Sequence, residues 1–154
     1  MNNSFKVIKG GLVTPQKTDG VPIVSAKDVF TFGISTDLNG SIFDRPGKPS
    51  EAIKSTLYCM QTDFTWERME QEIQKMNPVY YFQQEQVTEF CRMHAEELEP
   101  GTMTLFFVKE GDEIAVFTAI RMYGKKLTVY HDMVHRPTSH NEGVAAGFHI
   151  VIPD

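Results

Sequence analysis

The hydrophobic pattern changes period near the middle of the chain, and this change limits the fold more than any other feature of the sequence. Between residues 50 and 99, apolar residues recur every three or four positions, as on one face of a helix. From Thr102 onward they alternate, as in strands that bury one face. The pattern therefore predicts a helical segment followed by a β-sheet.

Two or three helices are expected in the central segment, over residues 50–64, 66–77 and 78–98. Thr65 would cap the second helix, and a proline is accepted in the first turn of the third. The apolar face of the first helix would consist of Ile53, Leu57, Met60 and Phe64. The third helix has an acidic side, formed by Glu85, Glu89, Glu96, Glu97 and Glu99.

Four strands are predicted in the C-terminal part, over residues 103–108, 113–122, 127–134 and 144–152. Turn-forming residues separate the first three strands, so the sheet should be an antiparallel meander packed on a helix. This order of elements resembles the cystatin-like and nuclear-transport-factor-like layouts in architecture. Fold resemblance of this kind does not define a function.

Residues 1–49 form an irregular arm that contains β-like pieces interrupted by glycine and proline. The arm is too apolar for a solvated tail, so it must lie against something. It could pack on its own domain, which we favour, or on a neighbouring subunit. The candidate interface residues are Phe5, Leu12, Val13, Phe30, Phe32, Ile42 and Phe43.

We therefore predict an α+β fold in a single domain of residues 1–154. The arm would occupy residues 1–49, the helices 50–99 and the antiparallel sheet 102–152. A chain of this length buries about two thirds of its unfolded surface, so it needs neither a disulfide nor a metal to form a core.

Turn lengths fix the register of a sheet, and they predict one polar row across it. With a three-residue loop at 110–112 and a two-residue turn at 124–125, the row would contain Thr104, Thr118, His131 and His149. The neighbouring residues on that face are apolar, and buried polar side chains need partners. We favour a hydrogen-bonded core row of structural importance only.

The alternative is that the same row lines a pocket between the sheet and the long helix. In that case His131 and His149 would act as acid and base, with Thr104 and Thr118 as orienting hydroxyls. A metal would be held by His131, His135 and His149, although their spacing matches no zinc signature. No motif for a nucleotide, metal or covalent catalyst is present, so no cofactor is expected.

The formal net charge of −5 argues against a protein that grips nucleic acid. No apolar stretch is long enough to span a bilayer, and residues 1–25 lack the apolar run of a signal peptide. We expect a cytoplasmic protein, or a virion component if the chain is viral. Cys59 and Cys91 have no CxxC spacing and are expected to be reduced, at helical positions.

The absence of catalytic motifs favours a non-enzymatic protein that binds other protein chains. It would be an assembly subunit, for example a viral structural component, or a small inhibitor. Its partners would be other protein chains, among them copies of itself in a homo-oligomer. The alternative is a small enzyme or ligand-binding domain that uses the His131 and His149 pocket.

Overall fold

The computed structural model describes residues 4–17, 21–34, 43, 49–122, 124, 126–133 and 143–154, the backbone alone for 131–133 and 143–144. Two α-helices and two short 3₁₀ helices accompany nine strands in this part of the chain. In chain order, these elements are β1 (Phe5–Thr14), η1 (Ile23–Ser25), β2 (Gly33–Ile34), β3 (Ile53–Met60), β4 (Phe64–Thr65), α1 (Trp66–Met76), α2 (Gln84–His94), η4 (Ala95–Glu97), β5 (Met103–Glu110), β6 (Glu113–Arg121), β7 (Leu127–Met133), β8 (Gly143–Val144) and β9 (His149–Pro153).

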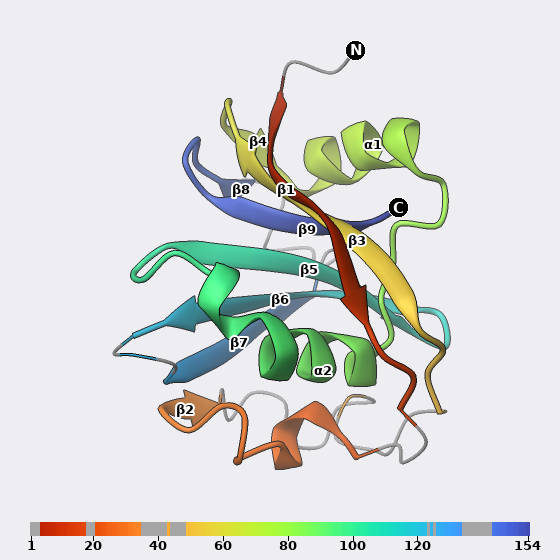
Figure 1. Cartoon of the computed structure of the whole chain (residues 1–154). Coiled ribbons are helices and arrows are strands. Elements are labelled where there is room, and N and C mark those ends of the chain that lie inside the picture. Colours follow the sequence, from red (N-terminus) through yellow and green to blue (C-terminus); the bar gives the residue numbers. More distant parts are fainter. Residues whose placement is uncertain are drawn as a thin grey trace.

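Seven strands form one mixed sheet in the order β1-β3-β9-β5-β6-β7-β2 (Figure 1). Neighbouring strands are antiparallel except for two parallel pairs, β5 with β9 and β2 with β7. Strands β4 and β8 form a separate two-stranded ribbon. The protein is therefore a mixed α/β fold, and the expected α+β class holds only at this coarser level.

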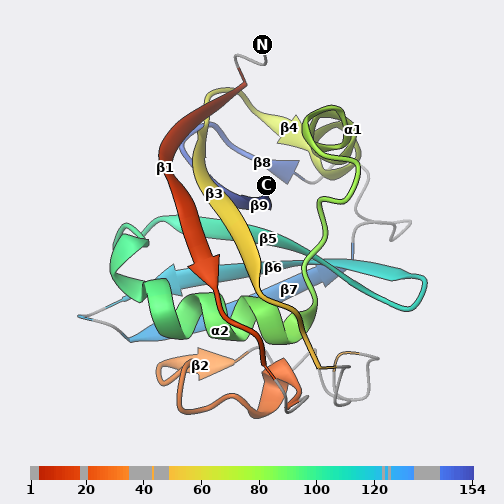
Figure 2. The same cartoon turned by 45° about the vertical axis from the view of Figure 1, so that its right-hand side comes forward.

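Each face of the sheet is covered by one helix, and the two faces bury separate hydrophobic clusters (Figures 1 and 2). Strand β5 separates them, because Phe106 and Val108 join the cluster of α2 while Leu105 and Phe107 join that of α1. All four side chains are at most 1% exposed. The central strands are thus buried on both faces.

The helix predicted over residues 50–64 is wrong, because most of this segment is strand β3. Its apolar residues are spaced as on a helix, but β3 lies between β1 and β9 and buries Leu57 on one face and Met60 on the other. A strand buried on both faces shows no clean alternation, so its period cannot be read from the sequence. Cys59 consequently lies in a strand and not in a helix.

The second predicted helix is confirmed as α1, where the Thr65 hydroxyl accepts a hydrogen bond from Arg68 N at 3.2 Å. The third predicted helix begins six residues later than expected, at Gln84. The residues before it are not helical, and their aromatic rings pack on opposite faces of β5. Tyr80 packs on Phe107, whereas Phe82 packs on Phe106.

The four-stranded meander is wrong in its last strand. Strands β5, β6 and β7 follow one another as predicted, but β9 inserts between β3 and β5. Ile150, Val151 and Ile152 are all at most 3% exposed. A strand that is apolar on both faces requires a position covered on both faces, and the centre of the sheet provides one.

The arm packs on its own chain in the part that the structure describes. Strand β1 pairs with β3, β2 pairs with β7, and residues 21–34 run alongside α2 (Figure 2). Ile42 lies outside the described residues. Four of the other candidate interface residues are buried in the chain's own core: Phe5 (6% exposed), Leu12 (4%), Phe30 (2%) and Phe43 (0%). The remaining two, Val13 (49%) and Phe32 (52%), are exposed.

Candidate functional site

Helix α2 has a polar stripe that faces the arm instead of solvent. Glu85, Thr88, Glu89 and Arg92 recur at the spacing of one helix face. Together with Lys17 and Asp28 they line a cavity of about 470 Å³, whose other lining residues are Val21 and Ala26. Glu85 and Glu89 are only 2% and 6% exposed, so the acidic side of this helix is buried.

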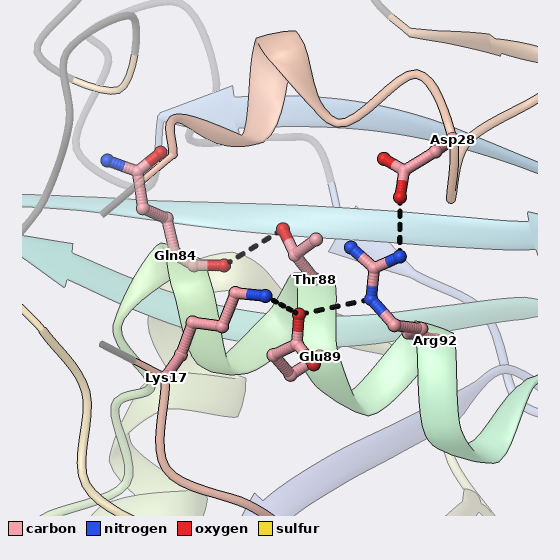
Figure 3. Close-up of polar contacts among 6 residues, drawn as sticks. All are labelled: Lys17, Asp28, Gln84, Thr88, Glu89 and Arg92. Atoms are coloured by element: carbon pink, nitrogen blue, oxygen red, sulfur yellow. Dashed lines mark hydrogen bonds and ion pairs between the residues drawn. The ribbon is translucent and has the colours of Figure 1, made fainter. Parts of the chain in front are cut away.

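A chain of ion pairs crosses this cavity (Figure 3). Glu89 Oε1 lies 3.2 Å from Lys17 Nζ and 3.1 Å from Arg92 Nε. The same guanidinium donates a hydrogen bond from Nη1 to Asp28 Oδ2. Lys17 and Arg92 therefore both pair with Glu89 on α2, and Arg92 also pairs with Asp28 on the arm.

The ionisation of the outer pair follows from this contact. The hydrogen bond from Arg92 lowers the pKa of Asp28, and the Asp28 carboxylate in turn raises the pKa of Arg92. The amide of Gln84 adds a neutral link, because its Oε1 accepts a hydrogen bond from Ile23 N at 2.9 Å. These contacts join residues that are 61 or more positions apart in the sequence. Their chemistry is that of a clamp holding the arm on α2.

The predicted polar row is only partly formed. Thr104 and His149 are direct register partners on the parallel strands β5 and β9. Both lie on the α2 face, where the row continues through Cys59 on one side and Ala119 on the other. The sequence predicts that Thr118 and His131 lie between Thr104 and His149 in this row, and that prediction is wrong.

Both turn lengths behind the predicted register were wrong by one residue. Glu110 pairs with Glu113, which leaves a two-residue turn that begins with Gly111 at a φ of 57°. At the next turn Met122 N donates to Lys126 O, which leaves three residues between them. A slip of one residue moves a side chain to the other face of a sheet.

The slip separates Thr118 from the predicted site, and the position of β9 separates His131 from it. Thr118 pairs with Leu105 and Tyr130, and Leu105 belongs to the α1 cluster. His131 pairs with Phe117 on β6, and β7 is separated from β9 by two strands. His131 and His149 are therefore not neighbours, because the strand that carries His149 inserts elsewhere in the sheet.

His149 is buried beside one carboxylate, Glu99, whose side chain is 64% exposed. His149 itself is 6% exposed, and its Nε2 lies 3.5 Å from Glu99 Oε2. Burial lowers the pKa of His149, and the Glu99 carboxylate opposes this by raising it. His149 Nδ1 and Thr104 Oγ1 are buried without a protein hydrogen-bond partner. Buried polar atoms of this kind are commonly satisfied by ordered water, so they do not by themselves indicate a substrate site.

The remaining ligand-type residues do not form a metal centre in the described ranges, where no three His, Cys, Asp or Glu side chains are grouped for one. His135 lies outside the described residues. Cys59 and Cys91 are both free thiols. Burial raises the pKa of Cys91, which makes it a poor nucleophile.

Strand β1 is the edge of the sheet and the longest strand of the described part, with ten residues. Residues 6–11 are all exposed, so this stretch is uncovered on both faces. Among these, Val7 is 58% and Ile8 is 46% exposed. The opposite edge is the two-residue strand β2, which offers far less backbone.

The backbone groups of β1 that face outward follow from the pairing of β3. Met60 N and O bond to Phe148 and Gly147, and Lys54 O accepts from Asp154, so even-numbered residues of β3 turn their polar groups toward β9. Val7 pairs with Tyr58, another even-numbered residue. Its N–H and C=O therefore point to the outer edge.

One end of this outer edge is already occupied within the chain. Val13 pairs with Lys54, so it also turns its polar groups outward, and its carbonyl contacts His94 Nε2 at 2.8 Å. Two register irregularities interrupt β1, between Val7 and Lys9 and between Lys9 and Leu12. Such bulges limit uncontrolled pairing at an exposed edge. The open stretch is therefore the N-terminal half of the strand.

Comparisons with known proteins give no relative from which a role could be transferred. No family model matches the sequence, no curated protein is similar to it, and no solved structure is similar to the fold. In the part of the chain that the structure describes, neither helix has the length and apolar character needed to cross a membrane.

The sequence prediction missed the Lys17, Asp28, Glu89 and Arg92 clamp, although one signal for it was present. Glu85, Thr88, Glu89 and Arg92 share one face of the predicted helix, and such a face is usually solvated. The arm supplies the two remaining partners from more than 60 positions away. The sequence does not encode that proximity in any local pattern.

Proposed function

We propose that this protein works by binding another protein chain, whose extended segment adds to the outer edge of β1. The observation that carries this proposal is the uncovered stretch of residues 6–11 at the edge of a seven-stranded sheet. Strand addition of this kind gains affinity from main-chain hydrogen bonds and specificity from alternate side chains. Val7 supplies the outward N–H and C=O, and its exposed side chain supplies apolar surface.

Two contacts of β1 with the end of α2 and with η4 support the same function indirectly. A binding edge must be held rigid, since flexible edges lose conformational entropy when a partner binds. Lys9 Nζ contacts Glu97 Oε1 at 2.6 Å, and His94 contacts the Val13 carbonyl at 2.8 Å. These contacts fix β1 to the end of α2 and leave its N-terminal half accessible.

The test is a selection from a library of random twelve-residue peptides on the immobilised full chain. Enriched peptides should protect the amide of Val7 from hydrogen exchange. Val7→Pro should abolish their binding, because proline removes the outward N–H while an edge strand tolerates it. As a matched control, Val79→Ala changes a valine that is 70% exposed away from β1 and should leave binding unchanged.

Two results would overturn the proposal. One is a set of enriched peptides that protects amides elsewhere and leaves residues 5–9 unaffected. The other is unchanged binding by a folded Val7→Pro variant. Thermal unfolding of each variant separates lost binding from lost structure, because an edge substitution should leave the melting temperature within a few degrees.

The alternative function, a small enzyme or ligand-binding domain, has weaker support. Its pocket required His131 beside His149, and these residues lie on strands that are not neighbours. Of the four residues that this pocket needed, only Thr104 and His149 remain together. We therefore retain strand addition as the function to test.

A further inference from the structure

We infer that the segment recruited by β1 is acidic on one face and apolar on the other, a partner class that rests on the proposed function of β1. The segment would be an extended strand in which Asp or Glu alternates with aliphatic residues. The geometry behind this inference is the distribution of lysine and valine between the two faces of β1.

The lysines of β1 lie on one face of the sheet. Lys6 pairs with Cys59 and Lys9 pairs with Leu57, and Leu57 belongs to the cluster of α2. Register partners on neighbouring strands share a face. Both lysines are exposed, so the α2 face of the strand presents positive charge along its edge.

The exposed valines lie on the other face. Val7 pairs with Tyr58, which packs against the cluster of α1. Val13 pairs with Lys54, which lies four positions from Tyr58 in β3 and therefore on the same face of the sheet. Val7 is 58% exposed and lies in the open stretch, whereas Val13 is 49% exposed and lies at the end that His94 occupies. A strand added to β1 therefore meets lysine on one face and aliphatic surface on the other.

The charge of this edge is opposite to that of the whole chain. Residues 1–18 contain Lys6, Lys9 and Lys17 and no acidic residue, while the formal net charge of the chain is −5. Lys54 adds a further exposed positive charge on β3. Opposite charges placed directly across two strands are favourable and like charges are not, so carboxylates are the matching side chains.

The intramolecular contact of Lys9 does not prevent this recognition. Lys9 is 52% exposed and its partner Glu97 is 31% exposed. An ion pair in such surroundings is weak, because water and salt screen it. A carboxylate of the incoming strand can therefore share or replace Glu97.

A second copy of this chain fits the edge poorly. If two β1 strands paired about a two-fold axis, every charged residue on both would be a lysine, because residues 4–14 contain no Asp or Glu. No register would then place a carboxylate opposite Lys6 or Lys9. The charge pattern favours a different, acidic chain over self-association.

The test uses two synthetic ten-residue peptides, one of alternating Glu and Val and one of alternating Lys and Val. Each is titrated into the full chain at low salt, while amide chemical shifts of β1 and the binding affinity are measured. The acidic peptide should bind about tenfold more tightly than the basic one. Its glutamates attract Lys6 and Lys9 across the strand pair, whereas the lysines of the basic peptide repel them. This preference should shrink as salt is added.

Charge reversal supplies the matched control. The double variant Lys6→Glu and Lys9→Glu should reverse the preference, so that the basic peptide binds more tightly. The variant Lys27→Glu with Lys126→Glu changes the net charge equally at exposed positions elsewhere and should retain the original preference. Melting temperatures confirm that both variants are folded.

The outcomes separate the partner class from the proposed function. If both peptides shift β1 amides with equal affinity, or the basic one binds more tightly, the acidic partner is wrong and strand addition stands. If neither peptide shifts β1 amides, strand addition itself is wrong. A dimer in native mass spectrometry that Val7→Pro dissociates would identify a second copy as the occupant and overturn the acidic partner.

Discussion

Helices α1 and α2 each have eleven residues and an apolar stripe against the sheet, but their polar sides have opposite surroundings. On α1 only Trp66, Met69 and Ile73 are buried, and its other residues are partly or fully exposed. On α2 all eight residues from Gln84 to Cys91 are buried, because the arm covers the polar side.

The difference appears most clearly in two glutamates that have equivalent partners. Glu72 on α1 contacts Arg68 and Lys75, whose side chains are 66% and 72% exposed. Glu89 on α2 contacts Lys17 and Arg92, whose side chains are 30% and 42% exposed. A polar helix face can therefore be buried when a distant segment supplies the opposite charges. On α1 the side chain of Glu72 is 14% exposed, but both of its partners remain in solvent.

The largest effect is expected on the apolar side of α2. Phe90 is fully buried and packs on Phe106 with the ring centroids 5.3 Å apart. Phe90→Ala should lower the free energy of unfolding by about 4 kcal/mol, through lost burial and a residual cavity. Chemical denaturation measures this loss. Met93→Ala, at a position 56% exposed on the same helix, should change it by less than about 0.5 kcal/mol.

The two glutamates provide a direct test of the comparison. Glu89→Gln should lower the free energy of unfolding by about 2 kcal/mol, because Lys17 and Arg92 lose a shared carboxylate whose side chain is only 8% exposed. Glu72→Gln should lower it by about 0.5 kcal/mol, since both partners are solvated. Urea denaturation measures both losses in the free energy of unfolding. Equal losses would show that the different exposure of the partner side chains has no effect on stability.

The N-terminus of α1 should show a smaller effect. Thr65→Ala removes the oxygen that accepts from Arg68 N, and the cost should be about 1 kcal/mol. Thr65→Ser keeps that oxygen and should restore most of the loss. Thermal unfolding of both variants checks the assignment, and an Ala variant as stable as the Ser variant would contradict it.

The smallest effect is a pH dependence on the α2 face. Burial lowers the pKa of His149 below the ordinary value of 6.5, so below pH 6.5 the unfolded chain binds more protons than the folded one. The contribution of His149 to stability should therefore be present above pH 6.5 and be lost as the pH falls through and below that value. Comparing chemical denaturation at pH 7.5 and 5.5 for the wild type and His149→Asn isolates this contribution. An identical pH response in both proteins would contradict the assignment.

The sequence predicted α1, its cap and the succession β5, β6 and β7, because each depends on neighbours within a few positions. It failed for residues 50–64, where Ile53, Leu57 and Met60 follow a helical spacing in a strand buried on both faces. It also failed for His131, because β9 inserts between β3 and β5, and for Thr118, because the predicted turn before β6 was wrong by one residue. An error of that size is invisible in the pattern but moves a side chain to the opposite face.

The sequence by itself determined the change of period at residue 102, the acidic side of the third predicted helix and the positive charge of residues 1–18. Only the tertiary structure decided that β9 lies between β3 and β5, that Glu89 meets Lys17, and that β1 is the open edge. The physical reason is the sequence separation of the interacting residues. Helix faces and charges follow from spacing along the chain, whereas strand order and buried ion pairs depend on which distant segments share the same core.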